Sequence, residues 1–320
     1  MQPMVHRIEL PTGIGIHQLG SLLRRANFFP ANATKIVLSF HPKKTFLDPL
    51  GIALLASWGS YCRERGVGIQ CENLQSPGLL YAHRMGLFES LQVKYPKVVE
   101  AHEGAGRFVA LTRVATQDEL SLLCAEMGGV LKVPHLIKCA QYTLSEMVRN
   151  TIEHAGAAAF VCAQYYEKDK RVTIGVADCG RGIKESLSAN YCFQDDATAL
   201  LAALMPRVTG AKRHMYGAPD NAGLGLYYAR GMSKASGRSF VLLSGNVAYK
   251  QRAKQKSAVP THNPAEESHE SLSGLFPWQG TAVGVNVRGI DVNMDTFMAR
   301  MDRAVNIGRQ MARRPRINFT

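Results

Sequence analysis

The sequence lacks the apolar run of about 20 residues that a membrane-spanning helix requires. Its 7 cysteines are scattered without a C-x-x-C pair, which fits reduced thiols better than a disulfide framework or a zinc site. The first residues, MQPMVHRIELPTG, also lack the apolar core of a secretory signal. These absences predict a soluble, cytoplasmic protein.

Acidic residues are scarce relative to basic ones, because 25 aspartates and glutamates stand against 38 lysines and arginines. The resulting formal net charge of +13 fits nucleic acid, an acidic partner or bound phosphates, and the charge alone does not decide among them. The chain has 320 residues, of which 46% are hydrophobic, so it is long enough for two globular domains with proper cores.

Residues 1–104 alternate strand and helix patterns, which is typical of an α/β domain. Gly66 is expected to end a helix and to start the turn into the next strand. The pattern predicts strands at 7–10, 35–40 and 67–71, and helices at 16–26, 49–65 and 79–85.

The order of these elements and the segment FLDPLGIALL resemble STAS domains, the small modules typified by anti-sigma-factor antagonists. In that family a phosphorylatable serine follows an aspartate and precedes a glycine at the start of a helix. Here Asp48 and Gly51 are present, but Pro49 and Leu50 stand between them. The resemblance therefore implies a docking or scaffold module that lacks the phosphoacceptor hydroxyl.

The stretch SEMVRNTIEHA places Glu146, Asn150 and His154 at four-residue spacing, which puts them on one face of a helix. A carboxylate one turn before a carboxamide suits a site where the acid orients a water molecule and the amide oxygen holds Mg²⁺. A solvated helix face is the alternative, and for His154 a hydrogen-bonded structural role is also open. On this helix Met147 and Thr151 are expected to face away and pack.

A strand predicted at 171–177 runs directly into DCGRGI, which begins at Asp178. This places a carboxylate at the mouth of the sheet, where it can accept a hydrogen bond from an exocyclic amine such as that of adenine. The glycines that follow, Gly180 and Gly182, allow the backbone to approach a flat ligand closely. Six residues with two glycines also occur by chance.

The segment Gly223, Leu224 and Gly225 directly precedes a helix pattern. Its glycines are expected to open the helix N-terminus toward phosphate, because free N–H groups and the helix dipole favour negative charge there. A simple loop-to-helix turn is the alternative. Later in the chain, QGTAVGVNVR alternates as a strand, and its Thr281 hydroxyl is expected to join Asp178.

Together these four motifs resemble the GHKL, or Bergerat-fold, ATPase superfamily, which includes gyrase, heat-shock chaperone ATPases, histidine kinases and mismatch-repair ATPases. The resemblance covers about residues 108 to 290 and implies an α/β sandwich, a mixed sheet covered on one face by helices. It implies ATP and Mg²⁺ as cofactors. Glu146 would then activate the attacking water, Asn150 would hold Mg²⁺, and Asp178 with Thr281 would bind adenine.

Two resemblances and a basic tail divide the chain into a STAS-like domain, a GHKL ATP-binding domain and a C-terminal segment, at residues 1–104, 105–290 and 291–320. Residues 184–220 correspond to the ATP lid, in which Lys212 and Arg213 could meet the phosphates. A solvated basic loop is the alternative. Residues 248–277 are polar, with basic and then acidic charge, and are expected to form a mobile insertion between two strands.

The C-terminal segment carries 6 arginines along an amphipathic helix pattern. A protein-docking helix, a contact with nucleic-acid phosphates and a helix that packs on the ATPase sheet are all open. We therefore expect a protein partner, through this segment or the STAS-like domain. Nucleic acid has no motif to support it, and no membrane contact is expected.

The expected activity is slow, Mg²⁺-dependent ATP hydrolysis that acts as a conformational switch in a regulatory or multiprotein system. A sensor histidine kinase would need a phosphoacceptor histidine on a dimerisation helix, and topoisomerase or mismatch-repair relatives would need a transducer domain after the ATPase. The alternative is a protein serine/threonine kinase of the anti-sigma-factor type, which has a similar S-E-x-x-x-N pattern and acts on a STAS partner.

Overall fold

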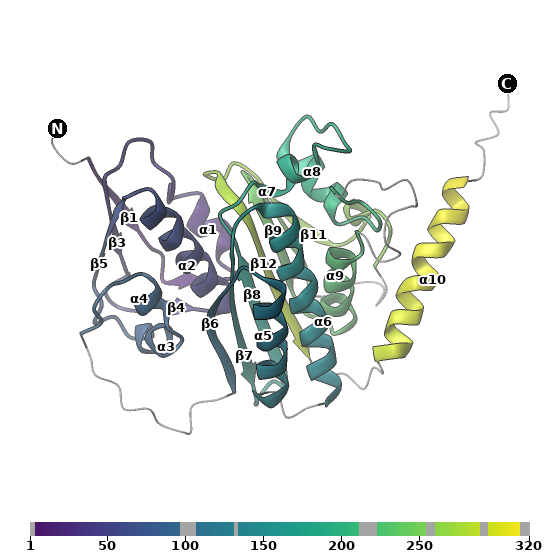
Figure 1. Ribbon diagram of the computed structural model, residues 1–320, viewed down its shortest axis with the longest axis horizontal. Helices are drawn as coiled ribbons and strands as arrows, with labels where there is room; N and C mark the ends of the chain where they lie inside the picture. Colours follow the sequence, from purple (N-terminus) through teal and green to yellow (C-terminus); the bar gives the residue numbers. More distant parts are fainter. Residues whose placement is uncertain are drawn as a thin grey trace.

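Helix α2 (Pro49–Glu64) lies between two β-sheets, one built by the N-terminal part of the chain and one by the remainder (Figure 1). The structure is a computed structural model that describes residues 4–96, 107–130, 134–210, 223–253, 260–288 and 294–313. Both parts contain helices and strands, which confirms the predicted α/β class. None of the helices in these ranges combines the length and the apolar character that a membrane crossing requires.

The smaller sheet is parallel, with the strand order β1-β3-β5, and α2 connects β3 to β5. Asp48 caps the start of α2, because its side-chain Oδ1 accepts a hydrogen bond from the Gly51 N–H at 3.1 Å. The strands and helices predicted in this part are present, and β2 and β4 form an additional short pair. The elements are β1 (Val5–Glu9), β2 (Gly13–Ile14), α1 (Leu19–Leu23), β3 (Lys35–Ser39), β4 (Phe46–Leu47), α2, β5 (Gly68–Glu72), α3 (Leu79–Arg84) and α4 (Leu87–Ser90).

The larger sheet has seven strands in the order β11-β10-β9-β12-β8-β7-β6. We expected a mixed sheet, but every strand pair described in it is antiparallel. Two hairpins, β7–β8 and β9–β10, and the position of β12 between β9 and β8 produce this pattern. The strands are β6 (Phe108–Val114), β7 (Ala159–Tyr166), β8 (Arg171–Ala177), β9 (Phe240–Gly245), β10 (Val247–Gln251), β11 (His269–Leu272) and β12 (Trp278–Arg288).

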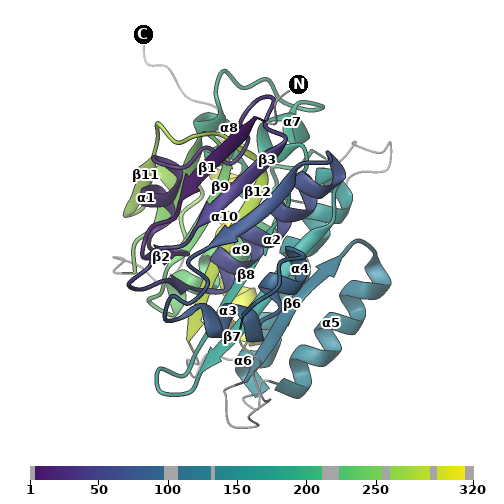
Figure 2. The same ribbon diagram turned by 90° about the vertical axis from the view of Figure 1, so that its left-hand side faces the viewer.

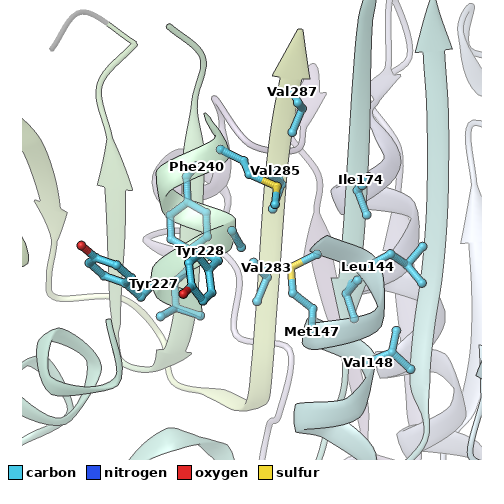
Figure 3. Close-up of a cluster of buried hydrophobic side chains, with 14 of the residues drawn as sticks. Leu144, Met147, Val148, Ile174, Tyr227, Tyr228, Phe240, Val283, Val285 and Val287 are labelled. Carbon is cyan, nitrogen blue, oxygen red and sulfur yellow. The ribbon is translucent and has the colours of Figure 1, made fainter. Parts of the chain in front are cut away.

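Helices cover both faces of the larger sheet, whereas we expected helices on one face only (Figures 1 and 2). On one face, α6 inserts Leu144, Met147 and Val148 into a core with side chains of α9 and the central strands (Figure 3). The opposite face packs against α2. The helices outside the N-terminal part are α5 (Gln117–Val130), α6 (Pro134–Asn150), the π-helical turn η1 (Thr151–Ala155), α7 (Gly182–Leu187), α8 (Asp196–Ala203), α9 (Gly225–Ala235), the 3₁₀ turn η2 (Pro264–Glu266) and α10 (Met294–Arg313).

The described parts of the 248–277 segment differ from the predicted mobile insertion, because β10 and β11 extend the larger sheet. Their charges pair instead of facing solvent separately: Lys250 and Glu270 are cross-strand neighbours whose charged atoms lie 3.5 Å apart. Glu267, whose side chain is 1% exposed, receives a hydrogen bond from Lys234 of α9 at 3.0 Å. Part of the mixed charge of this segment, at Lys250, Glu267 and Glu270, therefore takes part in ion pairs within the fold.

The first turns of α10 pack against the helix α9, whereas the packing alternative for the C-terminal segment placed this helix on the sheet. Phe297, Met301 and Val305 are buried at helical spacing. Met301 lies so close to Gly231 that a Cβ there would be 2.5 Å from the Met301 methyl carbon. The arginines in this stretch, Arg300 and Arg303, are exposed on the outer side of the helix.

The start of α2 lies directly on the middle of the larger sheet. A Cβ at Gly175 of β8 would lie 2.4 Å from the Leu50 Cα, and one at Gly284 of β12 would lie 2.8 Å from a Leu50 methyl carbon. The N-terminal part and the remainder of the chain consequently share one hydrophobic core, to which both α2 and the larger sheet contribute. The first turn of α2, where the STAS resemblance places its switch position, is covered by the same chain.

We predict that Gly175→Ala destabilises the protein, because the added methyl group would overlap backbone atoms of Leu50 that have no free direction to move. Overpacking of this kind costs about 2–3 kcal/mol of unfolding free energy. Gly68→Ala is the matched control, since the nearest atom to a Cβ there is 3.8 Å away in an exposed stretch of β5. Denaturant unfolding measures both variants. Equal stability of the two would contradict the close contact.

Candidate functional site

A cavity of about 260 Å³ lies between the larger sheet and the helices α6, α7 and α9. Its wall combines the end of α6, the π-helical turn η1, the end of β8 and the beginning of α9, so segments far apart in the sequence meet there. The sequence-predicted residues that line it are Glu146, Asn150, His154, Asp178, Gly223, Gly225 and Thr281. The structure therefore brings together at least one residue from each of the four motifs.

Asp178 forms a buried polar end of the cavity, with 2% of the residue exposed. Its Oδ1 accepts hydrogen bonds from the backbone N–H groups of Gly180, at 2.9 Å, and Thr281, at 3.3 Å. Its Oδ2 accepts one from the Thr151 hydroxyl at 3.3 Å. Burial raises the pKa of this carboxyl to about 6, and these three hydrogen bonds limit the rise. At neutral pH the Asp178 carboxyl group is therefore mostly ionised and acts as a hydrogen-bond acceptor.

Thr151 is a cavity residue that we expected to face away from the site. The α6 helix changes into the wider π-helical turn η1 at this residue, which alters the directions of the side chains that follow. As a result Thr151 bonds to Asp178, and Met147 also lines the cavity. A strict four-residue spacing carried through residue 155 does not predict this change. Thr281 differs from expectation as well, because the contact found is its backbone N–H.

Gly180 and Gly182 do not line the cavity, although we expected them to give a ligand close access to the backbone. Both glycines instead fit one segment of chain against another. A Cβ at Gly180 would lie 2.3 Å from the Ala155 carbonyl oxygen, and Gly182 has a φ of +77° where α7 begins. Gly180 thus lets the Asp178 loop lie against the turn η1, and Gly182 lies next to Ser244 and Gly280.

Glu146 forms the opposite polar end of the cavity, next to the beginning of α9. A Cβ at Gly225, the first residue of α9, would lie 2.7 Å from the Glu146 Oε2 atom. On its other side, the Glu146 Oε1 atom accepts a hydrogen bond from Arg149 at 2.9 Å. Burial raises the pKa of Glu146, and the positive charge of Arg149 lowers it in part. The Glu146 carboxylate therefore lies beside the first backbone N–H groups of α9.

Asn150 lines the cavity one helical turn beyond Glu146. Within the described ranges no hydrogen bond to its side chain is found, so its amide oxygen has no protein donor there. Mg²⁺ takes oxygen ligands and usually keeps several waters and phosphate oxygens in its shell, so it needs few protein ligands. Asn150 supplies such an oxygen at this end. No group of three metal-binding side chains is found among the described residues.

His154 extends the same wall, with its side chain 25% exposed, and burial lowers its pKa. Its backbone carbonyl accepts a hydrogen bond from Ser186 of α7 at 3.1 Å, which joins the turn η1 to that helix. No hydrogen bond to its imidazole is found in the described part of the chain, and its Nε2 atom lies 3.9 Å from the carboxylate of the neighbouring Glu153, so the structural role stays a prediction.

The predicted lid at 184–220 is described from residue 184 to residue 210, a stretch that contains most of α7 and all of α8. Val208 and Gly210 line the cavity, and the Arg207 N–H donates to the Gly223 carbonyl at 2.8 Å, which brings the end of one segment to the start of the other. Lys212 and Arg213 lie outside the described residues. Leu224, between the two glycines, is buried and is absent from the cavity wall as described.

A comparison of the chain with models of known protein families gives no match, and a search of curated proteins gives no significant one. The cavity is therefore the basis for a functional assignment. It offers a buried acceptor and hydroxyl at one end, and a helix N-terminus, a carboxylate and a carboxamide at the other. Such a wall suits a ligand with a flat amine-bearing group and an anionic tail.

We predict that Asp178→Asn removes a distinct pH dependence of stability. The pKa of Asp178 is about 6 in the folded protein and about 4 in an unfolded chain, so between these values the folded state holds a proton that the unfolded state releases. Wild-type stability relative to the variant should therefore fall as the pH rises from 4 to 6, by about 3 kcal/mol in total.

Asp195→Asn is the control for this experiment, because Asp195 caps α8 at the surface and its hydrogen bonds from Thr198 lower its pKa. Its contribution has the opposite sign and is lost as the pH falls below about 4. Chemical unfolding at a series of pH values measures both differences. The same slope for both variants would contradict the burial of an ionisable Asp178.

Proposed function

We propose that this chain binds ATP in the described cavity and hydrolyses it slowly with Mg²⁺, as a conformational switch of the GHKL type with a STAS-like N-terminal domain. A single observation carries the proposal: residues of four separate motifs, from Glu146 to Thr281 in the sequence, line one cavity. Chance motifs have no reason to converge in this way. The convergence favours a single nucleotide site.

The Asp178 end suits adenine. An ionised carboxylate accepts a hydrogen bond from an exocyclic amine, and the neighbouring hydroxyl of Thr151 can donate or accept beside it. The aliphatic side chains of Val176 and Val283 in the cavity wall supply apolar contact for a flat ring. A buried acceptor of this kind also disfavours a base that offers no donor, because the part of the carboxylate that faces the ligand would lose water without gaining a hydrogen bond.

The Glu146 end suits the phosphates. The helix α9 directs its first N–H groups and the positive end of its dipole toward this part of the wall. When bound, Mg²⁺ would neutralise phosphate charge, with Asn150 as its protein ligand. Glu146 is placed to accept the proton of an attacking water, and burial makes its carboxylate a stronger base than a free one.

The Asp178 loop is also joined to the N-terminal part, which supports a switch. The Trp278 indole N–H donates to the Asp178 carbonyl at 3.2 Å, and the same ring packs edge-on against Phe28 and Phe29. A single side chain, that of Trp278, therefore contacts both the adenine end of the cavity and the N-terminal part. Because the first turn of α2 is covered, a protein partner would reach this part through its other surfaces, or through α10.

We predict that Glu146→Gln abolishes ATP turnover but keeps affinity for Mg·ATP close to that of the wild type, because the acid matters where the proton leaves water. Asn150→Ala should weaken Mg·ATP binding as well as turnover, because a metal ligand acts in both ground and transition states. Glu153→Gln is the control: this carboxylate lines the same cavity, with 53% of its side chain exposed, and should keep turnover.

Calorimetry and phosphate release measure the three variants. Turnover that persists in Glu146→Gln would show that another group is the base. Equal binding losses in Glu146→Gln and Asn150→Ala would show that the two residues form one structural unit and would contradict their assigned roles.

We also predict that ATP labelled at its terminal phosphate releases free labelled phosphate and labels no protein, either alone or with candidate STAS proteins. The first turn of α2 offers no hydroxyl between Asp48 and Gly51, and its start is packed on the larger sheet. Electrophoresis and thin-layer chromatography distinguish the two products. A labelled STAS protein would move the assignment to a protein kinase.

A further inference from the structure

Arg149 is the only lysine or arginine among the described residues that line the cavity. It lies three residues after Glu146 on α6, so both side chains project from one face of the helix. Its guanidinium donates to the Glu146 Oε1 atom at 2.9 Å, and 40% of its side chain is exposed, against 14% for Glu146. The arginine is therefore the partner of this ion pair with more room to move.

The charges along the described wall leave Arg149 with a second possible partner. Three carboxylates, those of Glu146, Glu153 and Asp178, stand beside this one permanent cation and a histidine whose pKa is lowered by burial. A polyphosphate entering this wall meets mainly negative side chains, and Arg149 can offset them directly. The planar guanidinium carries five N–H donors, so it can hold a phosphate and a carboxylate in turn or together.

The ion pair with Arg149 weakens Glu146 as a base. Burial raises the pKa of the acid, but the guanidinium donates to one carboxylate oxygen and its positive charge lowers that pKa in part. The other oxygen lies against the beginning of α9, where the phosphates are expected. Moving Arg149 away frees the first oxygen and makes the carboxylate a stronger base for the proton of a water.

We propose that Arg149 binds the terminal phosphate of the nucleotide and, in doing so, releases Glu146 to act as the base; this inference rests on the proposed function. Water then attacks the terminal phosphorus while its proton passes to the freed Glu146 carboxylate. The bond between that phosphorus and the bridging oxygen breaks, and ADP leaves with the electron pair. Arg149 thereby makes the base available only when a triphosphate is present.

The test compares affinities for Mg·ATP and Mg·ADP in the wild type, Arg149→Gln and Arg149→Lys, by calorimetry. Loss of a charge-assisted contact to the terminal phosphate should lower ATP affinity about tenfold to hundredfold in Arg149→Gln, with ADP affinity changed less than about twofold. Lysine keeps the charge but lacks the planar pair of donors, so Arg149→Lys should recover part of the loss.

Arg24→Gln is the matched control, because it removes the same charge from an exposed position in the N-terminal part, away from the cavity wall. It should leave both affinities unchanged. An unchanged ratio of ATP to ADP affinity in Arg149→Gln would overturn the inference while leaving the proposed function intact. A wild type that binds neither nucleotide would overturn the proposed function itself.

Discussion

The contact of α2 with the larger sheet is the constraint on which the rest of the structure depends. The backbone of Leu50 lies against Gly175 and its side chain against Gly284, the glycines of two neighbouring central strands, and any larger residue there would separate the layers. This contact fixes the N-terminal part on the sheet face opposite to α6 and α9. Phe28 then reaches Trp278, which bonds to the Asp178 carbonyl. Trp278 thus connects the N-terminal part to the polar end of the cavity, beside the contact of Cys179 with Ser57 of α2.

The cavity has two polar ends, each with a carboxyl group whose charged form is disfavoured by burial. Burying the Asp178 carboxylate disfavours its charged form, and three hydrogen bonds offset only part of that cost. At the other end, Glu146 lies between the N-terminus of α9 and Arg149. Both ends therefore favour a ligand that supplies a donor to one and negative charge to the other, which is the basis for proposing a nucleotide.

Much of the local structure is predictable from the sequence, because it depends on short-range patterns. The strand β8 and the position of Asp178 directly after it follow from the alternating pattern and from the glycines that come next. The sequence analysis did not predict that α2 covers the second face of the larger sheet. The signal was present, because β7 is apolar on both sides, with Val161 in one core and Cys162 in the other. Thr151 was missed because a π-helical turn has no clear sequence signal, and Trp278 because its partner is distant in the chain.

The most direct test of the nucleotide site is the structure of the protein determined with Mg²⁺ and a non-hydrolysable ATP analogue. We expect the adenine amine within hydrogen-bonding distance of the Asp178 carboxylate and the phosphates at the beginning of α9, next to Asn150. A nucleotide found elsewhere on the chain, or bound in this cavity with its base at the Glu146 end, would contradict the account.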